Sequence, residues 1–224
     1  MKEVAPGVFQ LKGFPPNAIN VWLMGDVLVD AATKMSGNRI LKELKGRSIA
    51  AHALTHAHPD HQGASHEVCT KLAIPFWCGE KDAPAAEGGI DTIKTLQPKA
   101  GINSVIAGLW GGPGHPVDRA LKEGDEVAGF TVLDVPGHSA GHVAYWRESD
   151  RVLILGDVVN TMNLVTTVPG LREPPKPFTP DPATNRASIR KLAALQPAVV
   201  CAGHGPPWRD AEAFTRFADS LPAN

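Results

Sequence analysis

The stretch Thr55–His61, with the sequence THAHPDH, places three imidazoles and one carboxylate within six consecutive residues. It directly follows the run Ile49–Leu54, whose composition predicts a β-strand. Side chains two residues apart on an extended chain point to the same side, so His56 and His58 can converge on one point. Nitrogen and oxygen donors gathered just beyond a strand end are typical of a hydrolytic metal centre.

Asp60 and His61 extend this donor group to a second point in space. They lie where the chain turns from the predicted strand into a predicted helix over His61–Leu72. Two neighbouring metal ions can therefore be approached from one short stretch of sequence. A polar turn that happens to contain histidine would account for one such residue, but not for the whole cluster.

Three later apolar runs also end at residues that can bind a metal. Val132–Val135 leads to His138 and His142 within the sequence PGHSAGH, Val152–Leu155 leads to Asp157, and Ala198–Cys201 leads to His204. Glycines beside these residues allow the sharp turns and close backbone approach that a compact site needs. A single strand-end Asp is more often an ordinary turn residue. Four such segments in one chain point to a shared site.

Strands alternate with helices along the chain, which predicts an α/β layered domain. The expected strands are Val8–Leu11, Ile19–Met24, Val27–Asp30, Ile49–Leu54, Ile74–Cys78, Glu126–Val127, Phe130–Val135, Val143–Arg147, Val152–Leu155 and Ala198–Cys201. The expected helices follow residues 36–38 as far as Gly46, cover His61–Leu72 and Lys81–Ala86, run from Asp181 and Pro182 to Leu195, and begin at the cap Asp210. Residues 87–124 allow no assignment, and the proline-rich stretch 160–180 is predicted to be an irregular loop of the kind that often covers a functional site.

Length and composition favour one domain over residues 1–224, with 43% apolar and 20% charged residues. The 22 basic and 23 acidic side chains nearly cancel, so the chain lacks the basic face that nucleic-acid or anionic-membrane binding requires. Three cysteines without CxxC spacing give neither a disulfide framework nor a thiolate metal site. Because no apolar run suits a signal peptide or a membrane span, we expect a cytoplasmic protein with a small-molecule substrate and no nucleic-acid or membrane partner.

The complete donor pattern resembles the metallo-β-lactamase-fold hydrolase superfamily, and its motifs span most of the chain. The resemblance implies a four-layer αββα sandwich of two mixed sheets with helices outside and the metals at one sheet edge. It also implies a first metal on His56, His58 and His138, a second on Asp60, His61 and His204, and Asp157 as a bridge between them. Two divalent ions are expected, and a set of nitrogen and oxygen donors suits zinc while admitting iron or manganese. His142 belongs to the motif but is expected to support the ligands rather than to bind metal.

Departures from particular subfamilies narrow the expected activity. The most studied β-lactamases carry Cys in place of Asp157, and flavodiiron oxidoreductases carry Glu in place of His58 together with a flavodoxin domain. Glyoxalase II-type thioesterases have a helical extension, whereas only 20 residues follow His204. Transfer-RNA-processing nucleases need positive charge that this chain lacks. Quorum-quenching lactonases match in size and in PGHSxGH, but the only tyrosine, Tyr145, lies in a predicted strand rather than beside the metals.

These observations predict a dinuclear hydrolase in which a metal-bridging hydroxide attacks a small carbonyl ester, lactone or thioester. Asp60 is the candidate for orienting the hydroxide and passing a proton to the leaving group. No GxSxG motif offers a serine nucleophile. Phe14, Trp110, Phe178 and Trp208 are candidate substrate contacts, with ordinary core packing as the alternative for each.

Three other functions remain open from the sequence. A mononuclear iron sulfur (persulfide) dioxygenase would use His56, His58 and either Asp157 or His138. Dioxygenases of this superfamily tend to lose part of the second-metal set, whereas Asp60, His61 and His204 are all present here. A phosphodiesterase and a non-catalytic metal-binding module are the remaining alternatives, and the intact donor set speaks against the latter.

Overall fold

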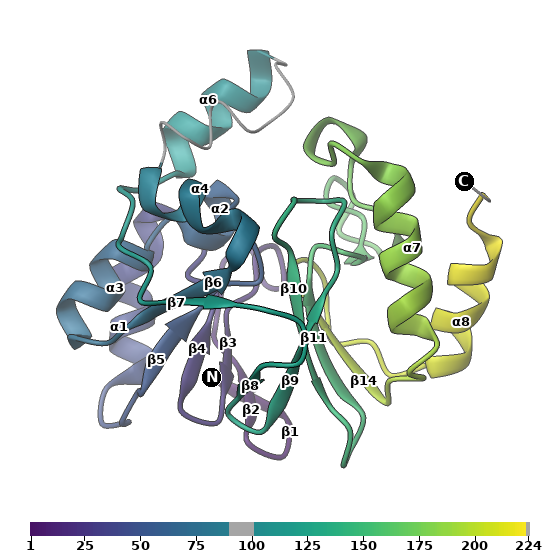
Figure 1. Ribbon diagram of the computed structural model, residues 1–224, viewed down its shortest axis with the longest axis horizontal. Helices are drawn as coiled ribbons and strands as arrows, with labels where there is room; N and C mark the ends of the chain where they lie inside the picture. The colour runs from purple at the N-terminus through teal and green to yellow at the C-terminus, as the bar shows by residue number, and fades with distance from the viewer. Residues whose placement is uncertain (90–100, 223–224) are drawn as a thin grey trace.

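Two β-sheets lie face to face at the centre of the molecule, with helices on both outer sides (Figure 1). The computed structural model describes residues 1–89 and 101–222. The first sheet contains β1 (Lys2–Ala5), β2 (Val8–Gln10), β3 (Trp22–Met24), β4 (Val27–Val29), β5 (Ala51–Ala53), β6 (Phe76–Gly79) and β7 (Arg119–Leu121), in that order. The second contains β14 (Val199–Ala202), β11 (Val152–Gly156), β10 (Val143–Arg147), β9 (Phe130–Asp134) and β8 (Glu126–Val127), in that order. Both sheets mix parallel and antiparallel pairs, as expected.

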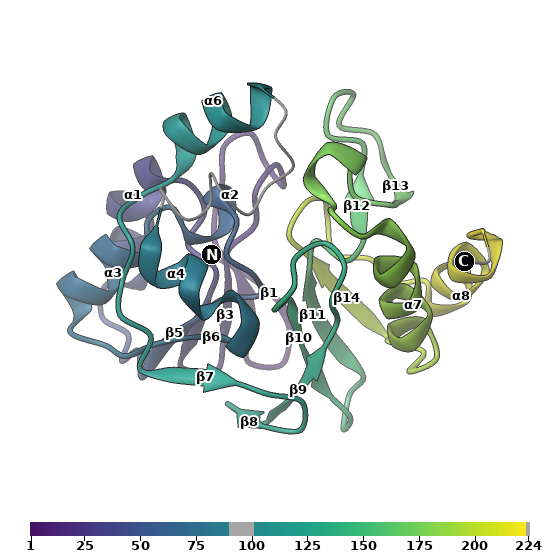
Figure 2. The ribbon, with the colours of Figure 1, turned by 45° about the horizontal axis from the view of Figure 1, so that its top comes forward.

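The helices form the two outer layers, so the four-layer αββα sandwich is confirmed (Figure 2). Over the first sheet lie α1 (Gly37–Leu44), α3 (Ser65–Leu72) and α4 (Ala83–Gly88), and over the second lie α7 (Pro182–Ala193) and α8 (Ala211–Ser220). Shorter or peripheral elements are η1 (Lys34–Ser36), α2 (Pro59–Gln62), η2 (Glu80–Asp82), α6 (Gly101–Trp110) and η3 (Lys176–Phe178). No helix in the described part of the chain is both long enough and apolar enough to cross a membrane.

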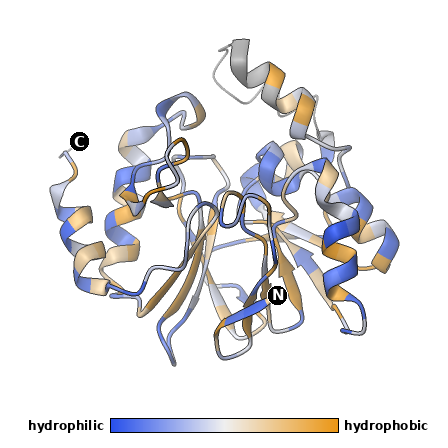
Figure 3. Ribbon diagram, turned by 180° about the vertical axis from the view of Figure 1, so that it is seen from behind, coloured by the Kyte–Doolittle hydropathy of each residue, from blue (hydrophilic) through white to orange (hydrophobic). Residues whose placement is uncertain are grey.

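Apolar side chains fill the space between the layers. The cluster between the two sheets includes Trp22, Phe130 and Tyr145, all almost fully buried. A second cluster joins the outer face of the second sheet to α7 and α8 through residues such as Ile189 and Phe214. Figure 3 shows the same distribution of hydropathy. The central strands are mostly hydrophobic (orange), whereas the outer helices alternate between hydrophobic and hydrophilic residues (orange and blue). Burial of these faces is the main driving force for this arrangement.

The predicted helix caps are confirmed at both helices of the second layer. The Asp181 carboxylate accepts a hydrogen bond from the Thr184 amide at 3.0 Å, and Asp210 accepts one from the Ala213 amide at 2.8 Å. Each bond satisfies an amide that has no partner within its own helix. The sequence therefore placed the starts of α7 and α8 correctly.

The stretch 160–180 is not irregular, so that expectation was wrong. It contains the antiparallel hairpin β12 (Asn160–Met162) and β13 (Pro169–Arg172), followed by η3. A strand is normally predicted from alternating apolar and polar residues. Prolines and a shift in register between Asn160 and Met162 interrupt that alternation here.

The expected helix over His61–Leu72 is interrupted. The chain forms α2 and then α3, with Gly63 between them. A Cβ at Gly63 would lie 2.4 Å from the Lys34 amide nitrogen and 2.5 Å from the Trp110 carbonyl oxygen. This close approach of three chain segments requires glycine and sets where α2 stops. The strands β1 and β7 and the helix α6 were not predicted, and residues 90–100 of the unassigned stretch lie outside the described residues.

Candidate metal centre

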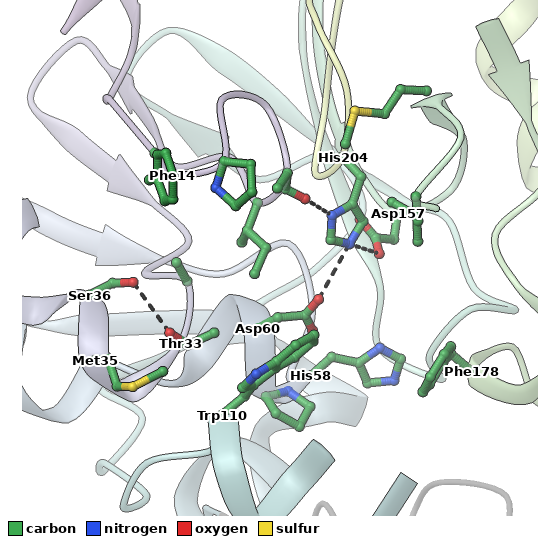
Figure 4. A pocket seen from close by; sticks show the side chains of 18 of the residues that line it. Phe14, Thr33, Met35, Ser36, His58, Asp60, Trp110, Asp157, Phe178 and His204 are labelled. Atoms are coloured by element: carbon green, nitrogen blue, oxygen red, sulfur yellow. Dashed lines mark hydrogen bonds and ion pairs between the residues drawn. The ribbon is translucent and has the colours of Figure 1, made fainter. Parts of the chain in front are cut away.

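All seven predicted metal ligands meet at one edge of the sandwich. The histidine-rich stretch follows β5, and the other donors follow β9, β11 and β14. Their donor atoms form three groups, each with all atoms within 4.8 Å of one another: His56, His58 and His138; His56, His61 and Asp157; and Asp60, His61 and His204. Because neighbouring groups share a histidine, the arrangement is consistent with a dinuclear metal site. Figure 4 shows His58, Asp60, Asp157 and His204 around the same cavity.

Several donor atoms are buried without a hydrogen-bond partner. They are Nε2 of His56, His61 and His138, and Oδ1 of Asp157. A buried polar atom left unpaired costs free energy, roughly 1–3 kcal/mol each. Metal ions would satisfy these atoms, because each one can offer a lone pair towards the shared centre once any proton it carries has left. The residues therefore fit the metal site that the donor pattern implies.

The buried carboxylate of Asp30 orients His61 directly and His56 through Thr55, on the side of each ring away from the metal site. Asp30 accepts hydrogen bonds at 2.8 Å from the amide and the hydroxyl of Thr55 and from Nδ1 of His61. The Thr55 oxygen in turn accepts from Nδ1 of His56 at 3.0 Å. With Nδ1 occupied, Nε2 of both rings is left to face the metal site. Sequence reasoning missed Asp30, although it ends the predicted strand Val27–Asp30 in the same way that Asp157 follows its strand.

Two further ligand rings, those of His138 and His204, are fixed by equivalent hydrogen bonds from different parts of the chain. Nδ1 of His138 donates to the Thr179 hydroxyl at 3.1 Å, and that hydroxyl donates to the Pro175 carbonyl at 3.2 Å. Nδ1 of His204 donates to the carbonyl of Ala18. Thr179 follows η3, so part of the stretch expected to be a loose cover supports a metal ligand.

Asp82 joins the two sheets next to the metal site. Its carboxylate is 4% exposed and accepts hydrogen bonds from the Ala57 amide at 3.0 Å and from the Ser139 hydroxyl and the Gly141 amide at 2.6 Å. Ala57 belongs to the loop after β5, whereas Ser139 and Gly141 belong to the loop after β9. Asp82 therefore holds the two loops of the first ligand group in register. No signal in the sequence marked this residue.

One glycine next to a ligand is required by the close packing of the centre. A Cβ at Gly203 would lie 2.1 Å from Oδ1 of Asp157 and 2.6 Å from Cε1 of His61. Real Cβ atoms do not approach other atoms so closely, so a larger residue would displace a ligand. The GHG segment that ends at Gly205 is thus constrained by sterics as well as by chemistry.

Protons compete with metal ions for two of the histidines. Nε2 of His204 lies 3.0 Å from Asp157 and 3.3 Å from Asp60. Burial opposes a charged imidazole, but the two carboxylates outweigh it and raise the pKa of His204 to about 10. Burial likewise opposes charge on His61, and Asp157, Asp30 and Asp60 together raise its pKa well above the ordinary value. Metal ions would take the place of these protons.

Two other ligands are held in the neutral form. Burial lowers the pKa of His56 and His138 well below the ordinary value, and neighbouring histidines lower each one further. Neutral imidazole is the form that binds metal. For Asp157, burial raises the pKa, but His204 and His61 outweigh burial and hold the pKa well below its usual range. The site therefore presents ready-made neutral and anionic donors side by side.

A cavity of about 470 Å³ is lined by five of the seven ligands, namely His58, Asp60, His138, Asp157 and His204 (Figure 4). Phe14, Trp110 and Phe178, three of the predicted substrate contacts, line it. Trp208 is not among the lining residues. Its indole nitrogen donates to the Asp210 carbonyl at 2.9 Å, and its ring packs against the apolar cluster under α7 and α8. The expectation for Trp208 is corrected accordingly, because nearness to His204 in sequence does not bring the ring to the cavity.

His142 and Tyr145 are structural at this edge of the fold. The ring of His142 stacks on His56, with centroids 4.5 Å apart, and its Nε2 donates to the Leu155 carbonyl at 3.1 Å. Burial lowers the pKa of His142 to about 3, so the ring is neutral. The Tyr145 hydroxyl is fully buried and donates to the Leu54 carbonyl at 2.6 Å. Tyr145 therefore supplies no phenol to the cavity.

Comparison with known proteins agrees with the fold and the donor set. Residues 14–204 match the family model of the metallo-beta-lactamase superfamily. The chain belongs to this superfamily, and its fold and site define a metal-dependent hydrolase of that class.

Two proteins of this superfamily are similar to the chain in sequence. It is 33% identical over 230 residues to YflN of Bacillus subtilis (strain 168), which is named a probable metallo-hydrolase, and the match covers 92% of this chain and 86% of that protein. A hydroxyacylglutathione hydrolase of Methylococcus capsulatus is 42% identical over 72 residues, which cover 29% of this chain and 27% of that enzyme.

Solved structures share the whole fold. The structure of BLEG-1, described as a B3 metallo-beta-lactamase, is 27% identical with a TM-score of 0.67 and covers 96% of this chain and 98% of its own. TTHA1623, solved in a di-iron-bound form, is 26% identical with a TM-score of 0.62 and covers 96% of both chains. Both solved structures therefore share the fold over nearly the whole of this chain.

Proposed function

We propose that this protein is a dinuclear zinc hydrolase that cleaves a carbonyl ester, lactone or thioester bond in a small molecule. The observation that carries the proposal is the set of buried, unpartnered donor atoms on His56, His61, His138 and Asp157. Two of these residues, His138 and Asp157, line a cavity large enough for a small substrate. Partial similarity to hydroxyacylglutathione hydrolases supports thioester cleavage as one form of this chemistry.

The donor groups suggest how two ions would be held. His56, His58 and His138 would hold one ion, and Asp60, His61 and His204 the other, with Asp157 placed to contact both. Ions bound there would lower the pKa of a water molecule and polarise a substrate carbonyl. The set contains only nitrogen and oxygen donors, which suits zinc and leaves iron or manganese as alternatives to be tested.

Asp60 is the proposed proton carrier at this site. It lines the cavity, and its side chain is 16% exposed, more than Asp157. Burial raises the pKa of Asp60, but His61 and His204 outweigh burial and leave the pKa below its usual value. The carboxylate is therefore an acceptor that can orient an attacking water molecule and move its proton towards the leaving group.

Covalent catalysis by cysteine is disfavoured in this chain. Cys69, Cys78 and Cys201 are all buried, and none lines the cavity. Burial raises the pKa of Cys69 and Cys201 to about 12, so neither thiol is a reactive thiolate near neutral pH. Direct attack by water accords better with these residues than a cysteinyl intermediate does.

The deciding experiment compares wild type with His204→Ala by elemental analysis, an ester, lactone and thioester panel, and an oxygen electrode. We expect two ions in wild type, about one in the variant, and a loss of hydrolysis of at least ~10²-fold because the second ion is lost. A chelator should abolish wild-type activity, whereas cysteine-directed reagents should not. One iron per wild-type chain together with thiol-dependent oxygen uptake would instead establish the sulfur dioxygenase alternative.

A further inference from the structure

The exposed large apolar side chains of the described residues come from segments around the mouth of the metal-site cavity. They are Phe14, Met35, Val105, Leu109, Leu164, Val165 and Val168. They belong to the loop before Pro15, to η1, to α6 and to the turn between β12 and β13. Figure 2 shows α6 and the β12–β13 hairpin projecting from the two halves of the molecule. Scattered exposed apolar residues are ordinary, but those of the group that also line the opening indicate a binding surface.

Three of these side chains line the cavity itself. Phe14 is 94% exposed, Met35 is 74% exposed and Leu164 is 41% exposed, and each contributes to the wall. We call these three the mouth residues. Ile19 and Phe178 also line the cavity and extend its apolar wall, and Figure 4 shows Phe178 near the metal ligands. An apolar surface thus runs from solvent to the point where the carbonyl would react.

Away from the metal ligands, the wall of the cavity offers little to an anionic group on a substrate. Among the described lining residues, Arg39 is the only lysine or arginine. Its guanidinium already donates to the Lys12 carbonyl and lies 3.8 Å from the Glu43 carboxylate. A substrate tail that carries carboxylates would meet no unpaired cation on this wall.

We propose that the substrate is a neutral amphiphile, an ester, lactone or thioester whose aliphatic acyl chain lies along the mouth residues, Ile19 and Phe178. This proposal rests on the proposed hydrolase function, because the scissile carbonyl of the substrate must reach the metal ligands while its acyl chain points towards solvent. The cavity of about 470 Å³ falls within the usual range for small-molecule sites, roughly 300–1,000 Å³. Burial of the acyl chain, rather than charge, then sets the preference for one substrate over another.

The test measures kcat/KM for p-nitrophenyl esters from acetyl through butanoyl, hexanoyl and octanoyl to decanoyl, each below its micelle-forming concentration. We expect a rise of about twofold to fourfold per methylene, up to the limit of ~0.8 kcal/mol per buried methylene. A hydroxyacylglutathione, short and charged, should be a poorer substrate than the decanoyl ester. The reverse order, or equal kcat/KM along the series, would overturn the proposal and leave the hydrolase function intact.

Two matched variants localise the effect. Leu164→Asn keeps the size of a cavity-lining side chain but makes it polar, and we expect kcat/KM to fall at least about tenfold more for decanoyl than for acetyl ester. Val165→Thr makes the same kind of change at the adjacent residue, which is 92% exposed and does not line the cavity. The control should behave as wild type throughout. Equal losses in the two variants, or a changed oligomeric state in Leu164→Asn, would show an interface rather than a substrate wall.

A binding measurement separates this proposal from the hydrolase proposal. Methyl alkyl ketones carry the same chains but no hydrolysable bond, so calorimetry can follow their affinity without turnover. We expect affinity to rise with chain length in wild type and to lose that rise in Leu164→Asn and Met35→Gln. If no ester is hydrolysed while the ketones show this dependence, the apolar site stands and the hydrolase function fails. If the ketones bind independently of chain length, the apolar site fails.

Discussion

The metal ligands and the mouth of the cavity are built in opposite ways. The histidine ligands are at most 9% exposed, and the rings of His56, His61, His138 and His204 are each held by a hydrogen bond at Nδ1. At the mouth, Phe14 and Met35 are 94% and 74% exposed and lie outside the apolar clusters of the core. The inner region is fixed before any substrate arrives, whereas the outer region is free to be covered by one.

We therefore expect the inner residues to determine the reaction and the mouth residues to determine which substrate is preferred. Changes to the inner residues should alter metal binding and stability together, because four of the histidine ligands there are hydrogen-bonded to the fold through Nδ1. Changes at the mouth should alter substrate preference alone, because those side chains do little for folding. Four predictions test this contrast.

The largest effect is expected for Asp157→Ala. This carboxylate lies within the donor groups and is 3.0 Å from His204, so its loss removes a ligand and the negative charge that offsets two cations. Turnover should fall at least ~10³-fold, with less metal bound per chain. Elemental analysis and ester hydrolysis measure both. Asp219→Ala, an exposed carboxylate near the end of α8, is the control and should be unaffected, and full metal content with normal turnover in Asp157→Ala would remove that residue from the site.

Asp30→Asn should show that the inner region depends on residues that touch no metal. Asparagine keeps the shape but cannot accept all three hydrogen bonds from Thr55 and His61 with full charge. Metal affinity should fall about 10-fold to 100-fold, measured by competition with a chelating dye. An unchanged affinity would mean that packing alone orients the rings.

His52, buried under α3, should make the folded state sensitive to acid. Burial lowers its pKa from 6.5 to about 4, so the folded chain binds fewer protons at this group than the unfolded chain. Its stabilising contribution is complete above pH 6.5 and is lost as the pH falls from 6.5 to about 4. Between pH 8 and pH 5, His52→Gln should lose about 2 kcal/mol less unfolding free energy than wild type, measured by urea denaturation. Parallel pH curves for the two proteins would contradict this.

The smallest effect is expected for the stability of Met35→Gln. Its side chain is largely exposed, so the free energy of unfolding should stay within about 0.5 kcal/mol of wild type. Urea denaturation provides the measurement. A loss of more than about 1 kcal/mol would mean that the mouth residues also support the fold, and the contrast between the two regions would weaken.

Much of the fold was readable from local sequence. Strand runs such as Val143–Arg147 and the caps Asp181 and Asp210 depend on neighbours within a few residues, and these predictions were confirmed. The hairpin within 160–180 and the helix α6 were not predicted, because prolines and glycines conceal their patterns. The break at Gly63 could not be predicted either, since contacts with Lys34 and Trp110 impose it.

The sequence by itself determined which side chains could bind metal, because each candidate stands just past an apolar run and the turn chemistry around it is local. Only the tertiary structure decided how those side chains are used. Nδ1 of His204 is held by the carbonyl of Ala18, 186 residues away, and Asp82 joins loops that belong to different sheets. It also decided that Phe14 and Phe178 share a cavity while Trp208 does not. Side-chain direction and partner choice depend on packing between distant segments, and no local pattern encodes that packing.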